Sequence, residues 1–143
     1  MDIAAELASN YALKRGDILF NRTNSADLVG KVGIFQMDGC YLFASYLVRI
    51  ETDRTVLMPE FLNFHLNSSA GQIAVRTFAT PGVSQSNISA GSLKRVYVPM
   101  PPLTEQRKIV RELSEIAATK RTAKGYIEVQ QAAQRELINS FVS

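Results

Sequence analysis

Two polar segments carry the side chains best suited to chemistry in this 143-residue sequence. Residues 21–25 read Asn-Arg-Thr-Asn-Ser, and residues 80–87 hold a second group, with Arg76 shortly before it. Asn, Gln and Arg make paired hydrogen bonds with adenine and guanine edges in a DNA major groove, whereas Ser and Thr suit phosphates. The segments therefore predict a surface that contacts double-stranded DNA. Its predicted members are Asn21, Arg22, Thr23, Asn24, Lys31, Arg76, Thr80, Ser84, Gln85 and Asn87.

A purely structural role is the alternative for each of these side chains. Polar loops of this composition are common, and short polar side chains in turns often bond the neighbouring backbone. Asn24 and Asn87 fit that alternative best. The residue types alone leave both interpretations open.

Catalytic motifs are absent from the sequence. No glycine-rich AdoMet motif follows a strand, and no Asn-Pro-Pro-Tyr tetrad is present to hold a flipped base. The Gly30-Lys31 pair lacks the residues of a phosphate-binding loop, because Ser25 and Val32 occupy two of its required positions. One His and one Cys are too few for a Cys/His metal site. We therefore predict no catalytic residue, no metal site and no cofactor bound by this chain.

Charge and composition restrict the remaining classes. Residues 1–103 contain 9 Lys/Arg and 8 Asp/Glu, and residues 104–143 contain 7 and 5, so DNA binding would depend on locally placed charges. The lone Cys40 excludes an internal disulfide and is predicted to be a small core residue. No apolar run approaches the roughly 20 residues that span a bilayer, and no basic leader is present. The expected location is cytoplasmic, with no membrane partner.

Short strands and helices must position the two polar segments. Apolar patterning predicts strands at residues 18–20, 31–36, 40–51 and 96–100, with a turn at 37–39 joining the second and third. Helical spacing predicts helices at 59–69 and 70–78, with Pro59 in the first turn. Residues 80–92 are predicted to be a long polar loop. The fold class is therefore α+β, with a small sheet and short helices.

A long helix follows two prolines. Pro101 and Pro102 end the preceding strand, Thr104 is the predicted N-cap, and Glu105 suits the helix dipole in the first turn. The helix is predicted to reach about residue 142. Two domains result, at residues 1–103 and 104–143.

The long helix carries an apolar seam at alternating steps of four and three residues. Its 39 residues would reach roughly 58 Å at about 1.5 Å per residue, too far to bury against a small domain. We therefore predict that it pairs with a second helix in a coiled coil, although folding back on its own domain is the alternative. The apolar seam residues are Ile109, Leu113, Ile116, Ala123, Ile127, Leu137 and Phe141.

Four stretches together resemble the specificity subunit of type I restriction-modification systems. They are GDILFNRTNS (16–25), LVGKVGIF (28–35), GVSQSNIS (82–89) and VPMPPLTEQRKIV (98–110). The resemblance implies part of a target recognition domain followed by one of the family's long spacer helices. It also implies a non-catalytic subunit that reads DNA through residues 21–25 and 84–87.

The same resemblance implies the partners. These are double-stranded DNA, the modification subunit that binds AdoMet and methylates adenine, and the restriction subunit of the complex. The helix would pair with a second copy, with the modification subunit or with the rest of a specificity subunit. The alternative is an assembly role, in which the helix docks the modification subunit and the chain does not read DNA. The sequence gives neither the recognised bases nor the oligomeric state, and a fragment and a naturally short product both fit it.

Overall fold

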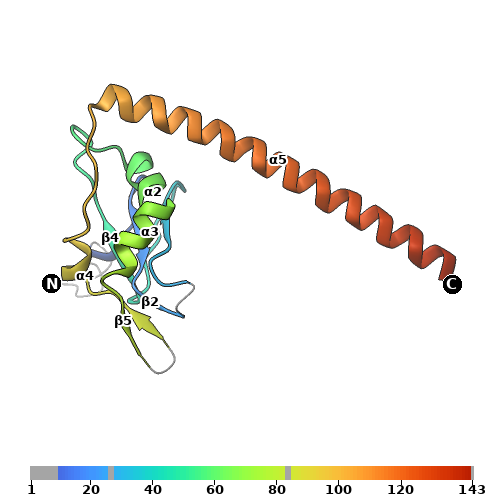
Figure 1. The fold of residues 1–143 in the computed structure, drawn as a ribbon, viewed down its shortest axis with the longest axis horizontal. Helices are drawn as coiled ribbons and strands as arrows, with labels where there is room; N and C mark the ends of the chain where they lie inside the picture. Colours follow the sequence, from blue (N-terminus) through green and yellow to red (C-terminus); the bar gives the residue numbers. More distant parts are fainter. Residues whose placement is uncertain (1–9, 26–27, 83–84, 143) are drawn as a thin grey trace. The chain divides into compact units, whose positions relative to one another are not determined.

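The computed structural model describes residues 10–25, 28–82 and 85–142, with side chains described as far as residue 135. The chain divides into two compact units, Met1–Arg107 and Lys108–Ser143. The first unit holds two small antiparallel sheets and short helices, and most of the second is helix (Figure 1). The predicted α+β class is therefore confirmed.

The first sheet is built on a central strand, β1 (Ile18–Asn21), between β3 (Val32–Ile34) and β4 (Leu47–Ile50). Both outer strands run antiparallel to β1. Ile18 and Phe20 are fully buried and alternate with half-buried neighbours, as the period-two pattern requires. The strands predicted at 18–20 and 31–36 are therefore confirmed.

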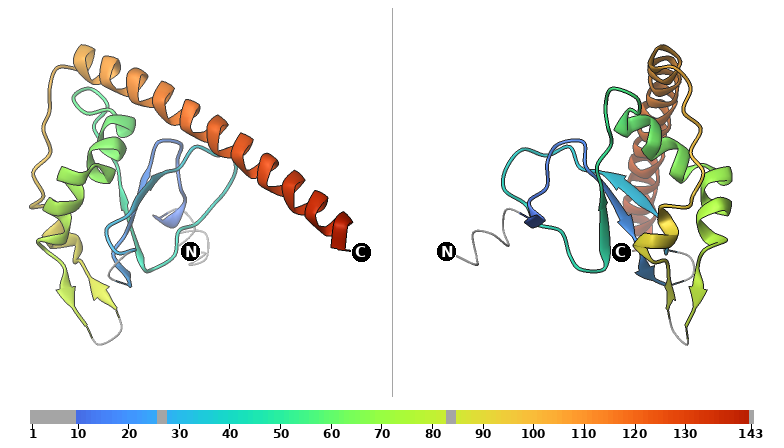
Figure 2. Two further views of the ribbon diagram at one scale, coloured as in Figure 1. Left: turned by 45° about the vertical axis from the view of Figure 1, so that its right-hand side comes forward. Right: turned by 90° about the vertical axis from the view of Figure 1, so that its left-hand side faces the viewer.

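Two short helices complete the core. Helix α2 (Pro59–Asn67) begins at a proline, and α3 (Ser69–Arg76) follows after Ser68, whose hydroxyl accepts a bond from the Gly71 amide at 3.1 Å. Leu62, Leu66 and Val75 from the helices pack against β1 in one buried cluster. The helices lie along one side of this sheet (Figure 2). Both predicted helices are confirmed.

The predicted loop at residues 80–92 is instead structured. Strands β5 (Thr80–Pro81) and β6 (Ser86–Asn87) pair, and β6 also pairs with β2 (Thr23–Asn24), giving a second sheet in the order β2-β6-β5. Helix α4 (Ala90–Leu93) follows, capped by the Ser89 hydroxyl, which accepts from the Ser92 amide at 2.9 Å. The loop prediction was wrong because the pairing with β2 joins residues about 60 positions apart, which a local pattern cannot show.

The prediction of one strand over residues 40–51 was also wrong. Only Leu47–Ile50 is a strand, and it pairs with β1 rather than forming a hairpin with β3. Aromatic contacts hold the preceding stretch instead, with Tyr11 against Phe43 and Phe35 edge-on to Tyr41. Cys40 lies in this stretch and is exposed, so its prediction as a core residue fails.

Residues 96–100 form no strand: Val96 lies in a bend, and residues 97–100 have no regular secondary structure. Val96 and Val98 pack against the core and Tyr97 between them is 80% exposed, so the predicted alternation is present at 96–98. It fails at Met100, which is 65% exposed, and the predicted strand does not form. The prolines at 99, 101 and 102 have no N–H to donate, which prevents regular pairing at the end of this segment.

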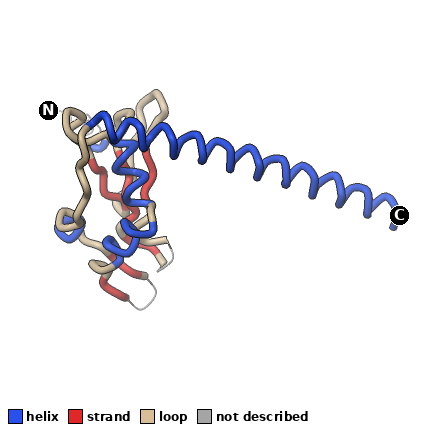
Figure 3. The backbone as a smooth tube through the Cα atoms, turned by 45° about the horizontal axis from the view of Figure 1, so that its top comes forward, coloured by secondary structure: helices blue, strands red, loops and turns tan. Residues whose placement is uncertain are grey.

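The long helix, α5, is confirmed and spans Leu103–Val142. It appears as one continuous helix in Figure 3. It begins one residue before the predicted N-cap, because the Pro102 carbonyl accepts from the amides of Glu105 (2.9 Å) and Gln106 (3.1 Å). Thr104 therefore lies inside the first turn, and the N-cap prediction was wrong. Glu105 is in the first turn as predicted.

Candidate nucleic-acid interface

The second sheet brings the two predicted polar segments together. In its register Thr23 lies opposite Asn87, and Asn87 lies opposite Thr80 on the other side. Directly opposed residues of antiparallel strands project to the same face, so these three side chains form one row across the sheet. The Thr23 hydroxyl donates to Asn87 Oδ1 at 2.9 Å. Thr80 and Asn87 are exposed, so the row is open to a ligand.

Ile88, the residue directly after β6, fixes this small sheet to the protein core. Ile88 is fully buried in the main apolar cluster. Its amide donates to the Arg22 carbonyl at 2.8 Å, which holds the two polar segments in register. The sheet thus presents polar groups on a rigid support.

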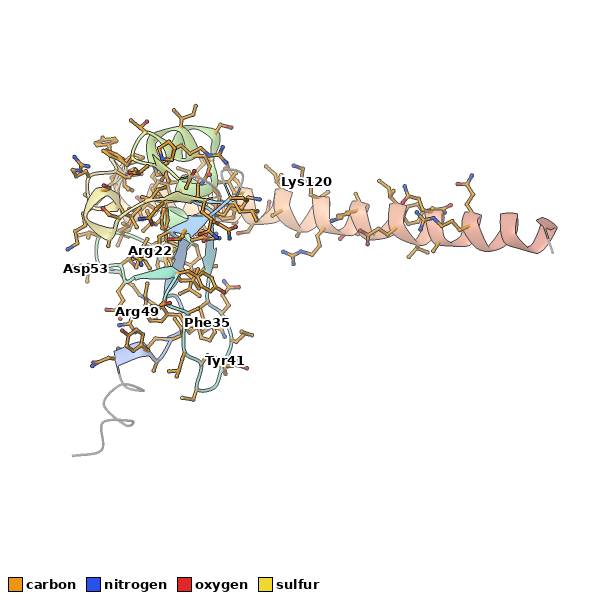
Figure 4. All side chains as sticks on the ribbon, turned by 90° about the horizontal axis from the view of Figure 1, so that it is seen from below. Arg22, Phe35, Tyr41, Arg49, Asp53 and Lys120 are labelled. Atoms are coloured by element: carbon orange, nitrogen blue, oxygen red, sulfur yellow. The ribbon has the colours of Figure 1, made fainter. Side chains whose placement is uncertain are left out.

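Asn21 and Arg22 lie where β1 passes into β2. Their amides donate to the carbonyls of Lys31 (2.9 Å) and Tyr46 (3.2 Å). Asn21 Oδ1 and Arg22 Nε are buried, and neither atom has a hydrogen-bond partner within the described part of the chain. Leaving a buried polar atom unpaired costs about 1–3 kcal/mol. These two side chains, of which Arg22 is labelled in Figure 4, therefore have hydrogen-bonding capacity that the fold does not use.

Gly30 lies close to α3 and to Ile88, the residue that follows β6. Its φ of +86° is in the left-handed region, and a Cβ there would lie 2.9 Å from Val75 Cγ1 and 3.8 Å from Ile88 Cδ1. Lys31, Arg76 and Ser89 directly follow Gly30, Val75 and Ile88 in sequence. Lys31 and Arg76 are exposed.

The remaining predicted residues differ in how well the structure describes them. Gln85 is exposed immediately before β6, whereas Ser84 lies outside the described residues. Asn24 Oδ1 accepts from the Ser25 amide at 2.8 Å, a local backbone bond of the kind that the structural alternative expects. Asn87 accepts from Thr23 through its side-chain oxygen, and the residue is exposed.

Gln106 has a structural role that the sequence patterns do not indicate. This side chain is 0% exposed, although it lies in the first turn of α5 between exposed neighbours. Its Nε2 donates to the carbonyls of Val56 (2.8 Å) and Pro101 (2.7 Å), and its Oε1 accepts from the Met58 amide at 2.9 Å. Gln106 lies within VPMPPLTEQRKIV (98–110), one of the four stretches that carry the family resemblance, but the stretch alone does not predict these buried contacts.

The loop that Gln106 contacts is itself ordered by Asp53. Asp53 Oδ1 accepts from the Thr55 hydroxyl at 2.6 Å and from the Thr55 amide at 2.9 Å. These bonds, the hydroxyl bond first, hold the pKa of the Asp53 carboxyl below its usual value. The turn places the Val56 carbonyl within reach of Gln106.

The apolar seam of α5 is open in the single chain. Ile116 is 60% and Ile127 55% exposed, and Ala123 is exposed as well. Ile109 and Leu113 are half-buried, whereas the side chains of Leu137 and Phe141 lie outside the described residues. Tyr126, which is also exposed, lines the same shallow surface as Ala123 and Ile127.

The described residues provide neither a metal site nor a membrane-spanning helix. They contain no group of three His, Cys, Asp or Glu residues that could hold a metal ion. None of the helices in the described part of the chain is both long enough and apolar enough to cross a membrane.

Comparison with known proteins gives one consistent result. Residues 2–130 match the family model described as the type I restriction modification DNA specificity domain. The putative type I restriction enzyme MjaX specificity subunit of Methanocaldococcus jannaschii is 30% identical over 138 residues, which are 96% of this chain and 32% of that protein. The StySPI specificity subunit of Salmonella potsdam is 31% identical over 112 residues, 77% of this chain and 24% of the relative. The EcoKI specificity subunit of Escherichia coli is 28% identical over 113 residues, with the same shares. The chain thus spans about a quarter to a third of the length of these relatives.

Proposed function

We propose that this chain contributes to recognition of target DNA in a type I restriction-modification system. The proposal starts from its family: the chain belongs to the type I restriction-modification DNA specificity domains. Specificity subunits of these systems are non-catalytic, and we assign no reaction to this chain. In the proposed division, residues 1–103 form the partial recognition domain and residues 104–143 the spacer helix.

One observation carries the DNA-binding proposal. The row of Thr23, Asn87 and Thr80 unites the two polar segments on one face of a sheet, with Gln85 exposed beside it. Asn21 and Arg22, both half-buried, directly precede Thr23 in the first polar segment. Donors and acceptors of this kind read base edges, and Lys31 and Arg76 suit phosphates.

The partners follow from the family. We infer that the chain works with double-stranded DNA and with the modification subunit, which would supply AdoMet, and that the restriction subunit joins for cleavage. No cofactor is assigned to the chain itself. The exposed seam of α5 favours helix pairing, with a second copy, the modification subunit or the rest of a specificity subunit as the partner.

A second candidate function is assembly without DNA reading. The exposed apolar face of α5 favours it, because that face requires a partner whether or not the sheet binds DNA. In this function the helix docks the modification subunit, and sequence reading takes place elsewhere in the complex.

Selection of DNA from a randomised duplex pool by the purified chain, at moderate salt, separates the two functions. DNA recognition predicts an enriched sequence motif that is lost in an Arg22→Ala, Gln85→Ala double variant of unchanged thermal stability. The absence of any enriched motif, together with co-purification of the chain with the modification subunit, would favour assembly instead.

A further inference from the structure

The two edges of the first sheet differ in whether their outward-facing backbone groups have hydrogen-bond partners. At the β3 edge, Asn67 Nδ2 donates to the Val32 carbonyl at 3.0 Å, and Asn67 Oδ1 lies 3.4 Å from the Val32 amide. The side-chain amide thereby occupies the outward-facing backbone groups of Val32, as a neighbouring strand would. This edge is closed to another strand.

The β4 edge is open. The Arg22 amide bonds the Tyr46 carbonyl, and antiparallel ladders alternate, so the backbone groups of Val48 and Ile50 face β1. The backbone N–H and C=O of Arg49 consequently face away from β1. Within residues 10–25, 28–82 and 85–142, no strand pairs with this edge.

An apolar groove of about 290 Å³ lies beside the open edge. Its walls come from three parts of the first unit: Val48 and Ile50 of β4, Leu62 and Leu66 of α2, and Val96 and Val98 of the segment after α4. Arg49, Glu51 and Lys94 also line it. The groove can therefore accept aliphatic side chains.

Residues 96–98 resemble a strand in how their side chains alternate, although they pair with no other strand. Val96 and Val98 face the core while Tyr97 faces solvent, which is the side-chain geometry of a strand. This segment and β4 line the same groove. Strand β4, whose outer edge is unpaired, and residues 96–98, which belong to no strand, therefore border the same apolar groove.

We propose that this groove binds an extended strand of a second polypeptide, which pairs with the outer edge of β4. The strand would bond the Arg49 N–H and C=O and place alternate apolar, β-branched side chains in the groove. An apolar small molecule would fill the groove but leave these backbone groups unpaired. A second copy of this chain would present the same concave groove, and one concave surface cannot fill another.

The test uses the full chain and a synthetic eight-residue peptide in which valine alternates with threonine between terminal lysines. Titration followed by amide NMR should shift the signals of residues 47–51 and 94–98 and leave those of residues 21–24 and 85–87 in place. A peptide N-methylated on the bonds that face β4 cannot pair. It should bind at least about tenfold more weakly, the loss expected for unmade backbone bonds.

Two substitutions at one position provide the matched control. Arg49→Pro removes the outward N–H while sparing the β1 ladder, and an edge strand tolerates proline there. Arg49→Ala loses the same side chain, with its bond to the Ala12 carbonyl, but keeps the N–H. Peptide affinity should fall about tenfold more in Arg49→Pro than in Arg49→Ala, with circular dichroism confirming that both variants fold.

Three results would overturn the proposal. One is the absence of binding at millimolar peptide. Another is equal binding of the N-methylated peptide, or equal affinity of the two Arg49 variants, which would indicate an apolar groove without strand pairing. The third is self-association of the chain that Arg49→Pro abolishes and Ile116→Asp does not, which would make a second copy the occupant.

Discussion

Gln106 ties the first turn of α5 to the loop before α2 through two hydrogen bonds, with Val56 and Met58, and makes a third to the Pro101 carbonyl. An amide side chain fits this position because one end accepts from an amide while the other donates to two carbonyls. Glutamate would lack the donors, and leucine would leave all three backbone groups unpaired. The position therefore depends on hydrogen-bonding capacity rather than on size.

We expect Gln106→Leu to lower the free energy of unfolding by about 2–4 kcal/mol, because it leaves the Met58 amide and two carbonyls without partners. Urea denaturation of the chain measures the change. Gln131→Leu on an exposed turn of the same helix is the control and should change stability by less than about 0.5 kcal/mol. Equal effects of the two substitutions would show that the buried bonds contribute nothing.

Gln85 gives the second prediction at this scale. Gln85→Ala should reduce affinity for the selected DNA sequence by about 1–3 kcal/mol, the range of one base contact, and leave binding to random duplex unchanged. Competition binding with both duplexes measures the difference. Gln36→Ala, at another exposed glutamine, is the control. Base reading by Gln85 would be contradicted if both variants lost affinity for the selected sequence equally, or if neither lost any.

Local sequence patterns were sufficient to predict some elements of the fold but not others. Helices α2, α3 and α5 and strands β1 and β3 follow from short-range spacing, prolines and serine caps, which the sequence displays directly. The second sheet does not, since Thr23 pairs with a residue in a segment that looks like an ordinary polar loop. The Gln106 contacts also join positions about 50 apart, so neither could be found by periodicity.

The seam of α5 is the testable feature at the scale of elements. Ile116→Asp and Ile127→Asp should each abolish helix pairing, because each would bury a charge at an apolar contact. Light scattering over a dilution series measures pairing, and circular dichroism reports helix content. Ala118→Asp introduces the same charge off the seam and should leave pairing intact. An unaltered chain that stays monomeric at every concentration would contradict self-pairing.

At the scale of the molecule, the polar sheet and the long helix have separate tasks in the proposed function. The sheet determines which bases are read, and the helix determines how far apart two recognition domains are held. This division predicts that DNA preference and half-site spacing change independently. Substitutions in the sheet should alter the selected bases alone, and changes in helix length should alter the spacing alone.

Deletion of residues 128–134 tests the second half of this division. One heptad is removed, so the seam on either side keeps its register. If two copies pair antiparallel along their helices, the spacer shortens by roughly 10 Å at about 1.5 Å per residue, or about three base pairs at roughly 3.4 Å each. Selection from a pool with variable half-site spacing should therefore recover the same bases about three base pairs closer together.

Deletion of only residues 131–134 is the matched control. Four residues rotate the later seam away from the earlier one, so this variant should pair weakly and lose spacing preference altogether. The heptad deletion should pair like the unaltered chain in light scattering. Unchanged spacing in a variant that still pairs and still selects the same bases would show that α5 does not determine the separation of the half-sites, and would leave DNA reading by the sheet intact.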